Sequence, residues 1–291
     1  MKIKRKSFLP IISILALVIV VGIIFFNKTI DDRVPSDGIY FINHRSYYAY
    51  GVEDEKTIYL DCYLVNSRKN EPDIFYSYSD FTLGDEAGVE YKITYSSADI
   101  SNLLEPTAPK QSSGTIAHHE MSIKFNPTTS TNITTLSYKD EMGNLVKRNL
   151  GLIQIDILPQ TREQLSTVSN RVFWQSSIQP TFTNAEFCFE NTSKSPLTIT
   201  EISYGSIGVL IHEGGVPITF APSETVDKII PVDLTEEVEG EPIVYYLKPK
   251  FLFIVDEEEH WGIMKNISRE KFIDLSEDEL REYLYLIDIS D

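Results

Sequence analysis

An uncharged apolar run near the N-terminus restricts how this chain can fold more than any other feature. Residues 8–26 read FLPIISILALVIVVGIIFF, and at about 1.5 Å of rise per residue a helix of this length matches the hydrocarbon thickness of a bilayer. Lys2, Lys4, Arg5 and Lys6 precede the run, and no cleavage site flanked by small residues follows it. The run predicts a retained single-pass transmembrane helix with a cytoplasmic N-terminus, and a cleaved signal peptide is the alternative.

Alternation of apolar and polar residues predicts that the remaining chain is built from strands. In residues 58–64, every second residue is apolar, namely Ile58, Leu60, Cys62 and Leu64. Residues 117–125 and 153–157 alternate in the same way, and glycine-containing turns separate such segments. A period of two with β-branched and aromatic residues is typical of half-buried antiparallel strands. Short strands with frequent turns favour β-sandwiches over an α/β enzyme fold.

Three segments carry a resemblance to a known family. They are residues 63–66 (YLVN), residues 79–91 (SDFTLGDEAGVEY) and residues 136–140 (LSYKD). With them, the first set of strands resembles the telokin-like, immunoglobulin-like ectodomains of membrane-anchored Gram-positive bacterial proteins. The resemblance implies an extracytoplasmic β-sandwich, and that family has no common catalytic site to transfer.

The C-terminus has a helix signal instead. Ser276 and Glu279 form a capping box, in which each side chain bonds the other residue's backbone N–H. One face then carries apolar residues at helical spacing, namely Leu280, Tyr283, Leu284 and Ile287. This face is expected to pack on the second sandwich, and the alternative is that it docks another protein.

The expected fold is therefore all-β, with an N-terminal transmembrane helix, two tandem immunoglobulin-like β-sandwiches and a short C-terminal helix. The expected parts are a cytoplasmic tail (1–7), the transmembrane helix (8–26), a stalk (27–38), a first sandwich (39–160), a linker (161–170), a second sandwich (171–268) and an acidic C-terminal helix and tail (269–291).

Charge and cysteine content exclude several classes of protein. The formal net charge of −17 argues against a nucleic-acid binder, which needs a cationic face. Two cysteines exclude a disulfide framework. Cys62 is expected in the core, whereas Cys188 lies on a polar strand face where Glu186 and Glu190 disfavour its thiolate.

No sequence pattern assembles a catalytic or metal site. His118 and Glu120 share a strand face and could hold one ion together, but the neighbouring His119 points the other way. The acidic run 256–259 is expected to be a solvated hairpin tip, because the calcium-loop pattern of an EF-hand is missing. Residues 205–208 lack the serine-elbow pattern of hydrolases. No catalytic, cofactor-binding or metal-binding residue is therefore assigned.

The expected function is a non-catalytic binding or interaction module at the cell envelope. The expected partners are the membrane and a protein or cell-envelope polymer, with no nucleic acid and no cofactor. Two alternatives stay open. One is a surface hydrolase that uses paired carboxylates in a cleft, and the other is an accessory subunit of a membrane complex. The expected localisation is the cell membrane, with most of the chain extracellular.

Overall fold

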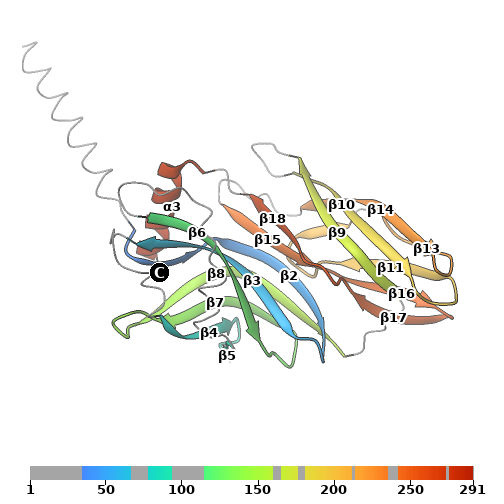
Figure 1. Ribbon diagram of the computed structural model, residues 1–291, viewed down its shortest axis with the longest axis horizontal. Helices are drawn as coiled ribbons and strands as arrows, with labels where there is room; N and C mark the ends of the chain where they lie inside the picture. The colour runs from blue at the N-terminus through green and yellow to red at the C-terminus, as the bar shows by residue number, and fades with distance from the viewer. Residues whose placement is uncertain are drawn as a thin grey trace, which may run out of the picture. The chain divides into compact units, whose positions relative to one another are not determined.

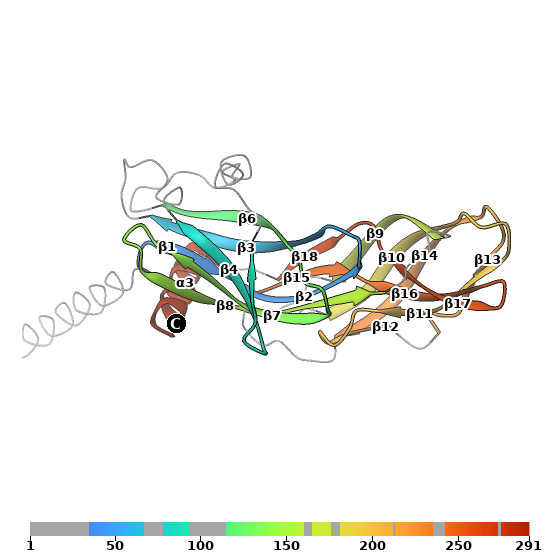
Figure 2. The ribbon, with the colours of Figure 1, turned by 90° about the horizontal axis from the view of Figure 1, so that it is seen from below.

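A computed structural model of the chain shows a mostly β protein (Figures 1 and 2). It describes residues 35–66, 78–93, 115–159, 165–175, 181–211, 214–234, 242–272 and 275–290. The described residues divide into two compact units. Strands make up the unit within Asp37–Asp274, and Ser36 groups with the C-terminal helix in the other.

A seven-stranded sheet runs through the larger unit and joins strands that are far apart in the sequence. Strand β2 lies between β15 and β8 and is parallel to both of them (Figure 1). The sheet order is β18 (Ser268–Phe272), β15 (Ile243–Lys248), β2 (Asn43–Gly51), β8 (Leu145–Leu158), β7 (Thr131–Lys139), β4 (Ser79–Asp85) and β5 (Glu90–Lys92).

Three smaller antiparallel sheets complete the unit. A three-stranded sheet has the order β1 (Gly38–Phe41), β3 (Lys56–Asn66) and β6 (Thr115–Phe125). One four-stranded sheet has the order β12 (Val209–Ile211), β14 (Thr225–Leu234), β10 (Thr181–Asn191) and β9 (Leu165–Gln175). The other has the order β13 (Ile218–Phe220), β11 (Leu197–Ser203), β16 (Lys250–Val255) and β17 (Glu258–Ile263).

The strand pairing corrects the prediction of two separately folded sandwiches in tandem. Ile243 and Val244 of β15 pair in parallel with Asn43 and His44 of β2, which places C-terminal strands in a sheet with N-terminal ones. The hydrophobic core of the four-stranded sheets also includes Tyr47 and other residues of the seven-stranded sheet. Local alternation identifies strands but not their partners, so sequence order was a poor guide to how the sheets are assembled.

The transmembrane helix is also corrected. In the part of the chain that the structure describes, no helix is long and apolar enough to cross a membrane. The one helix there, α3 (Glu277–Ser290), has 14 residues, whereas about 20 apolar residues are needed to span a bilayer. Residues 1–7, 8–26 and 27–34 lie outside the described residues. The predicted anchor, its orientation and the cell-membrane localisation are therefore not carried further.

The predicted capping box at the start of α3 is confirmed. The Ser276 backbone N–H donates to Glu279 Oε2 at 2.8 Å, and the Glu279 N–H donates to Ser276 Oγ at 3.4 Å. Leu284, from the predicted apolar face, is fully buried. Near the other end of the helix, Asp288 accepts hydrogen bonds from the backbone N–H and the hydroxyl of Ser36.

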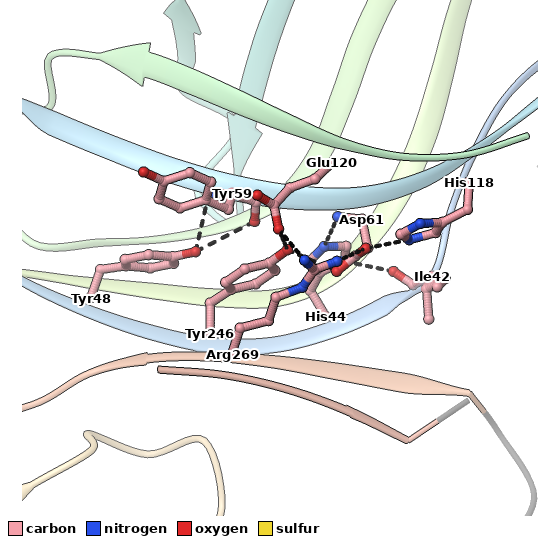
Figure 3. Close-up of polar contacts among 9 residues, drawn as sticks. All are labelled: Ile42, His44, Tyr48, Tyr59, Asp61, His118, Glu120, Tyr246 and Arg269. Carbon is pink, nitrogen blue, oxygen red and sulfur yellow. Dashed lines mark hydrogen bonds and ion pairs between the residues drawn. The ribbon is translucent and has the colours of Figure 1, made fainter. Parts of the chain in front are cut away.

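Strands β1 and β2 form a continuous stretch that leaves the three-stranded sheet at Ile42 and enters the seven-stranded sheet. β1 pairs with β3 only over residues 62–65, which leaves the backbone of the earlier part of β3 without a strand partner on that edge. Side chains from β2 take the place of the missing strand. They form hydrogen bonds with the backbone groups of alternate β3 residues that no strand pairs. The pairs are Thr57 with Tyr50, Tyr59 with Tyr48, and Asp61 with His44, and Figure 3 draws the last two. This arrangement satisfies buried polar groups that would otherwise be costly.

One buried hydroxyl lacks such a partner, and its removal gives a testable prediction. The Tyr204 hydroxyl is buried in the hydrophobic core and finds no hydrogen-bond partner among the described residues. Tyr204→Phe is expected to raise the free energy of unfolding by about 1 kcal/mol, because an unsatisfied buried hydroxyl is destabilising. Urea denaturation measures the change. Tyr47→Phe is the matched control, since the Tyr47 hydroxyl donates to Asp156 at 2.8 Å, and it is expected to lower stability. A loss of stability in Tyr204→Phe would contradict the prediction.

Candidate functional site

A carboxylate with no exposed surface lies at the centre of a cluster of polar side chains. Asp61, on β3, accepts three side-chain hydrogen bonds (Figure 3). His118 Nε2 lies 2.5 Å from Oδ1, Arg269 Nη2 donates to the same oxygen at 2.6 Å, and the Tyr246 hydroxyl donates to Oδ2 at 2.8 Å. Three donors on one buried carboxylate favour its ionised form.

Strand register explains why these side chains meet. Asp61 lies opposite Glu120 in the β3–β6 pair, and His118 is two residues before Glu120 on the same face. Tyr246 and Arg269 are direct partners in the β15–β18 pair and approach from the seven-stranded sheet (Figure 3). The cluster thus joins two sheets and four strands.

Glu120 is tied into the same network. It accepts a hydrogen bond from the Tyr246 hydroxyl at 2.7 Å and from Arg269 Nη1 at 2.7 Å. Tyr246 has a single phenolic proton, so at any moment it donates to Asp61 or to Glu120 but not to both. The guanidinium bridges both carboxylates and neutralises one of their two charges.

The buried His44 is held as a neutral ring. Its Nδ1 lies 2.6 Å from the Ile42 carbonyl oxygen and must donate there, so its Nε2 is the acceptor for the Asp61 backbone N–H at 2.9 Å. The ring also stacks on Tyr246, with ring centroids 6.2 Å apart. His44 therefore orients the backbone of Asp61 rather than carrying a charge.

Burial and charge set the protonation states of the two residues from the seven-stranded sheet. Burial raises the pKa of Tyr246 well above its usual value, and the charges of Asp61 and Glu120 raise it further. Burial alone would lower the pKa of Arg269, but Tyr246, Asp61 and Glu120 raise it above its usual value overall. Tyr246 stays protonated and Arg269 stays charged, which suits them to be permanent donors.

Exposure decides what the cluster can do chemically. The side chains of His118, Glu120 and Arg269 keep 26, 35 and 34% of their surface exposed, whereas that of Asp61 keeps none. A histidine oriented by a buried aspartate is an arrangement used for general bases. Here, however, both carboxylates are bound to Arg269, and a substrate cannot reach Asp61. The geometry is better suited to holding the two sheets together.

A second candidate is an open groove at the β4–β5 end of the seven-stranded sheet. Its cavity of about 460 Å³ lies within the usual range for ligand sites. The polar side chains that line it come from β4, the β4–β5 turn, β5, the β6–β7 loop, β7 and β8, and no lysine or arginine is among them. They are Asp85, Glu86, Tyr91, Thr129, Ser130, Thr131, Asn132, Gln154 and Asp156.

Hydrogen bonds fix the floor of this groove. Asp85 accepts from the Val89 N–H at 2.7 Å, from the Tyr91 hydroxyl at 2.9 Å and from the Thr131 hydroxyl at 2.9 Å. Partial burial opposes ionisation of Asp85, but these hydrogen bonds lower its pKa below the usual value overall. Asp156 accepts from Lys250 Nζ at 2.7 Å.

The polar side chains at the rim of the groove make fewer hydrogen bonds within the protein than those of the floor. Asn132 Nδ2 donates to Glu86 Oε2 at 3.1 Å, and the Glu86 backbone N–H donates to the Asn132 carbonyl oxygen. Ser130 accepts a hydrogen bond from the Ile157 N–H and keeps its hydroxyl proton for another acceptor. Glu86, Asn132 and Ser130 are therefore the groups best placed to meet a ligand.

The residues singled out in the sequence have mixed outcomes. His118 and Glu120 do share a face, as predicted, but they contact Asp61 and Arg269. Among the described residues no group of histidine, cysteine, aspartate and glutamate side chains is arranged to hold a metal ion. Of the acidic run 256–259, Asp256 and Glu257 form the β16–β17 hairpin tip, whereas Glu258 and Glu259 begin β17. The backbone N–H and hydroxyl of Ser206 both bond Gln154 Oε1.

Neither cysteine forms a disulfide bond. Cys62 is buried as predicted. A hydrogen bond to Asp227 contributes most to raising the pKa of the Cys188 thiol to about 11, and burial and the charges of Asp227, Glu186 and Glu190 add to it. The sequence pointed to the two glutamates, whereas the main partner lies opposite Cys188 on β14.

Asp61, Tyr246 and Arg269 were missed by sequence reasoning. Asp61 alternates with Tyr59 and Tyr63, which is the pattern of a solvent-facing edge of a strand. A charged residue between two tyrosines on an otherwise apolar strand was the only local signal. Its partners lie about two hundred residues away, at separations of 185 and 208 residues.

Comparison with known proteins gives no identity. No family model and no curated protein matches this chain. Among the solved structures, a protein of unknown function from Porphyromonas gingivalis W83 matches with 9% identity and a TM-score of 0.21, over 80% of this chain and 99% of that one. A similarity this low supports no statement about fold or function, so the resemblance of residues 63–66, 79–91 and 136–140 to telokin-like domains stays a prediction.

Proposed function

We propose that this protein is a non-catalytic binding module and that the groove beside Asp85 is its ligand site. The supporting observation is the prearranged floor of the groove, where Asp85 and Asp156 are held by hydrogen bonds before any ligand arrives. A site that is already ordered loses little entropy on binding. Exposed polar groups of Glu86 and Asn132 then remain at the rim for contact.

The chemistry of the groove favours ligands that bring hydrogen-bond donors. Carboxylate, amide and hydroxyl oxygens dominate the lining, which contains no lysine or arginine, although Lys250 pairs with Asp156 from outside it. A negatively charged ligand would meet repulsion, whereas hydroxyl groups or amines can donate to the lining oxygens. The ligand is therefore a neutral or positively charged molecule, such as a segment of a polymer or of a protein chain.

A binding experiment with three probes tests this proposal. Tetralysine and chitotetraose represent amine and hydroxyl donors, and tetraglutamate represents an anionic ligand. Trp261 reports on the groove, because Lys250 Nζ lies 4.9 Å from its ring centroid and also contacts Asp156. Titration of Trp261 fluorescence and of amide NMR signals is expected to show binding of tetralysine or chitotetraose but not of tetraglutamate.

Variants at the rim give the specificity control. Glu86→Gln and Asn132→Ala are expected to weaken binding of the probe about tenfold each, since one charge-assisted or well-aligned contact is worth about 1.4 kcal/mol. Glu141→Gln, at the exposed turn between β7 and β8, changes the same charge away from the groove and is expected to have no effect. Binding of none of the probes, or equal weakening by Glu141→Gln, would contradict the proposal.

A hydrolase that uses paired carboxylates remains the second candidate, because Asp61 and Glu120 do converge on one hydroxyl group. Full burial of Asp61 and the guanidinium of Arg269 between the two carboxylates count against it. If this candidate were correct, Glu120→Gln would abolish hydrolysis of a chromogenic glycoside. A wild-type protein with no such activity would end it.

A further inference from the structure

A buried lysine at the end of β15 has an unusual environment. Lys248 is only 9% exposed, and it pairs with Tyr48 in the parallel β15–β2 ladder. Its Nζ lies 3.8 Å above the centroid of the Tyr50 ring. Hydrogen bonds between the Tyr50 hydroxyl and the backbone of Thr57 fix this ring in place.

The amine has no anionic partner among the described residues. Its ammonium makes no ion pair and no hydrogen bond there, although Asp54 is close enough to act on it electrostatically. The Asp54 carboxylate instead accepts a hydrogen bond from the Gly51 N–H at 2.7 Å. Lys56, which is also buried, donates to the Val52 carbonyl oxygen. Lys248 is thus a desolvated amine that faces an aromatic ring.

A desolvated amine without a carboxylate is poorly suited to stay protonated. Burial lowers the pKa of Lys248 from its usual 10.5 to about 8, and the charge of Asp54 only partly opposes this. At pH 7 about a tenth of such amines are neutral, compared with roughly one in three thousand for an ordinary lysine. The neutral amine is the nucleophile, and desolvated lysines of this kind form Schiff bases in enzymes.

We propose that Lys248 is a covalent capture site for small aldehydes. The Nζ lone pair adds to the carbonyl carbon, both amine protons leave with the carbonyl oxygen as water, and a C=N bond remains. When the imine nitrogen is protonated, its positive charge lies against the face of the Tyr50 ring, which stabilises cations. Because Lys248 is only 9% exposed, the site admits only small carbonyl compounds. The proposal is independent of the groove beside Asp85.

Reductive methylation of the full chain tests the proposal. ¹³C-formaldehyde is added with cyanoborohydride at pH 7 in less than one equivalent per lysine, and peptide mapping locates the label. Lys248 is expected to be labelled at least tenfold faster than Lys147 and Lys228, which are exposed. NMR of the methylated Lys248 is expected to show a titration near pH 8.

Two controls make the result decisive. Lys248→Met is expected to lose the early label without changing the labelling of Lys147 and Lys228. Denatured protein is expected to be labelled evenly at all lysines. Labelling of Lys248 that is no faster than that of the exposed lysines, or that occurs only after denaturation, would overturn the proposal.

Discussion

Replacing Asp61 by asparagine is expected to lower the free energy of unfolding by about 3–5 kcal/mol. The amide keeps the shape of the side chain but offers one neutral acceptor oxygen where a carboxylate accepts from His118, Arg269 and Tyr246. The charge of Arg269 then loses its buried partner, and breaking one side of a buried ion pair has a cost of this size. Urea denaturation monitored by circular dichroism measures it.

A surface ion pair provides the matched control. Asp80 pairs with Lys139 at 2.7 Å, and both side chains are about half exposed or more. Asp80→Asn makes the same chemical change and is expected to leave stability nearly unchanged, because exposed pairs contribute little. Equal effects at Asp61 and Asp80 would show that the cluster does not hold the sheets together.

Arg269→Met tests the same interaction from the side that faces solvent, and it tests it alone if Asp61→Asn does not fold. The two variants and their combination form a double-mutant cycle. A coupling energy on the order of 2 kcal/mol is expected, since the two side chains are in direct contact. Additive effects would contradict the role assigned to the cluster.

Sequence pattern located the strands well because alternation is a local property. The alternating residues 153–157 lie in β8, and residues 58–64 lie in β3. The pattern did not predict correctly which faces of the strands are buried. Tyr63 and Asp61 were expected on a polar face, yet they are 8 and 0% exposed, because the three-stranded sheet is covered on that side as well. Alternation reports contrast between two faces and cannot reveal a second layer.

Some residues of the candidate site could likewise be predicted from local pattern, and others could not. The shared face of His118 and Glu120 follows from strand geometry and could be predicted. The position of Asp61 opposite Glu120 follows from the register of β3 with β6, which no local signal encodes. Arg269 reaches the cluster only because β15 pairs in parallel with β2 and carries β18 with it. Such long-range pairing depends on the packing of the whole fold.

Replacing Lys248 by methionine is expected to raise the free energy of unfolding at pH 7 by up to about 3 kcal/mol. The difference between a pKa of 10.5 in the unfolded chain and about 8 in the folded one corresponds to roughly this free energy. Methionine fills a similar volume over the Tyr50 ring and carries no charge to desolvate. The folded protein therefore no longer bears the cost of a buried ammonium.

The pH dependence of this effect has a definite sign. Between pH 8 and pH 10.5 the unfolded chain binds the proton of Lys248 more strongly than the folded protein does, so the contribution of this residue to stability rises with pH in that window. The advantage of Lys248→Met is therefore largest below pH 8 and disappears near pH 10.5. Buried tyrosines such as Tyr48 and Tyr246 also titrate at alkaline pH, but they are common to both proteins and cancel in the difference.

Lys147→Met, at an exposed position, is expected to show no such trend. A stability difference between wild type and Lys248→Met that stays constant from pH 7 to pH 10 would mean that the amine is not desolvated, and it would remove the physical basis for its reactivity as well.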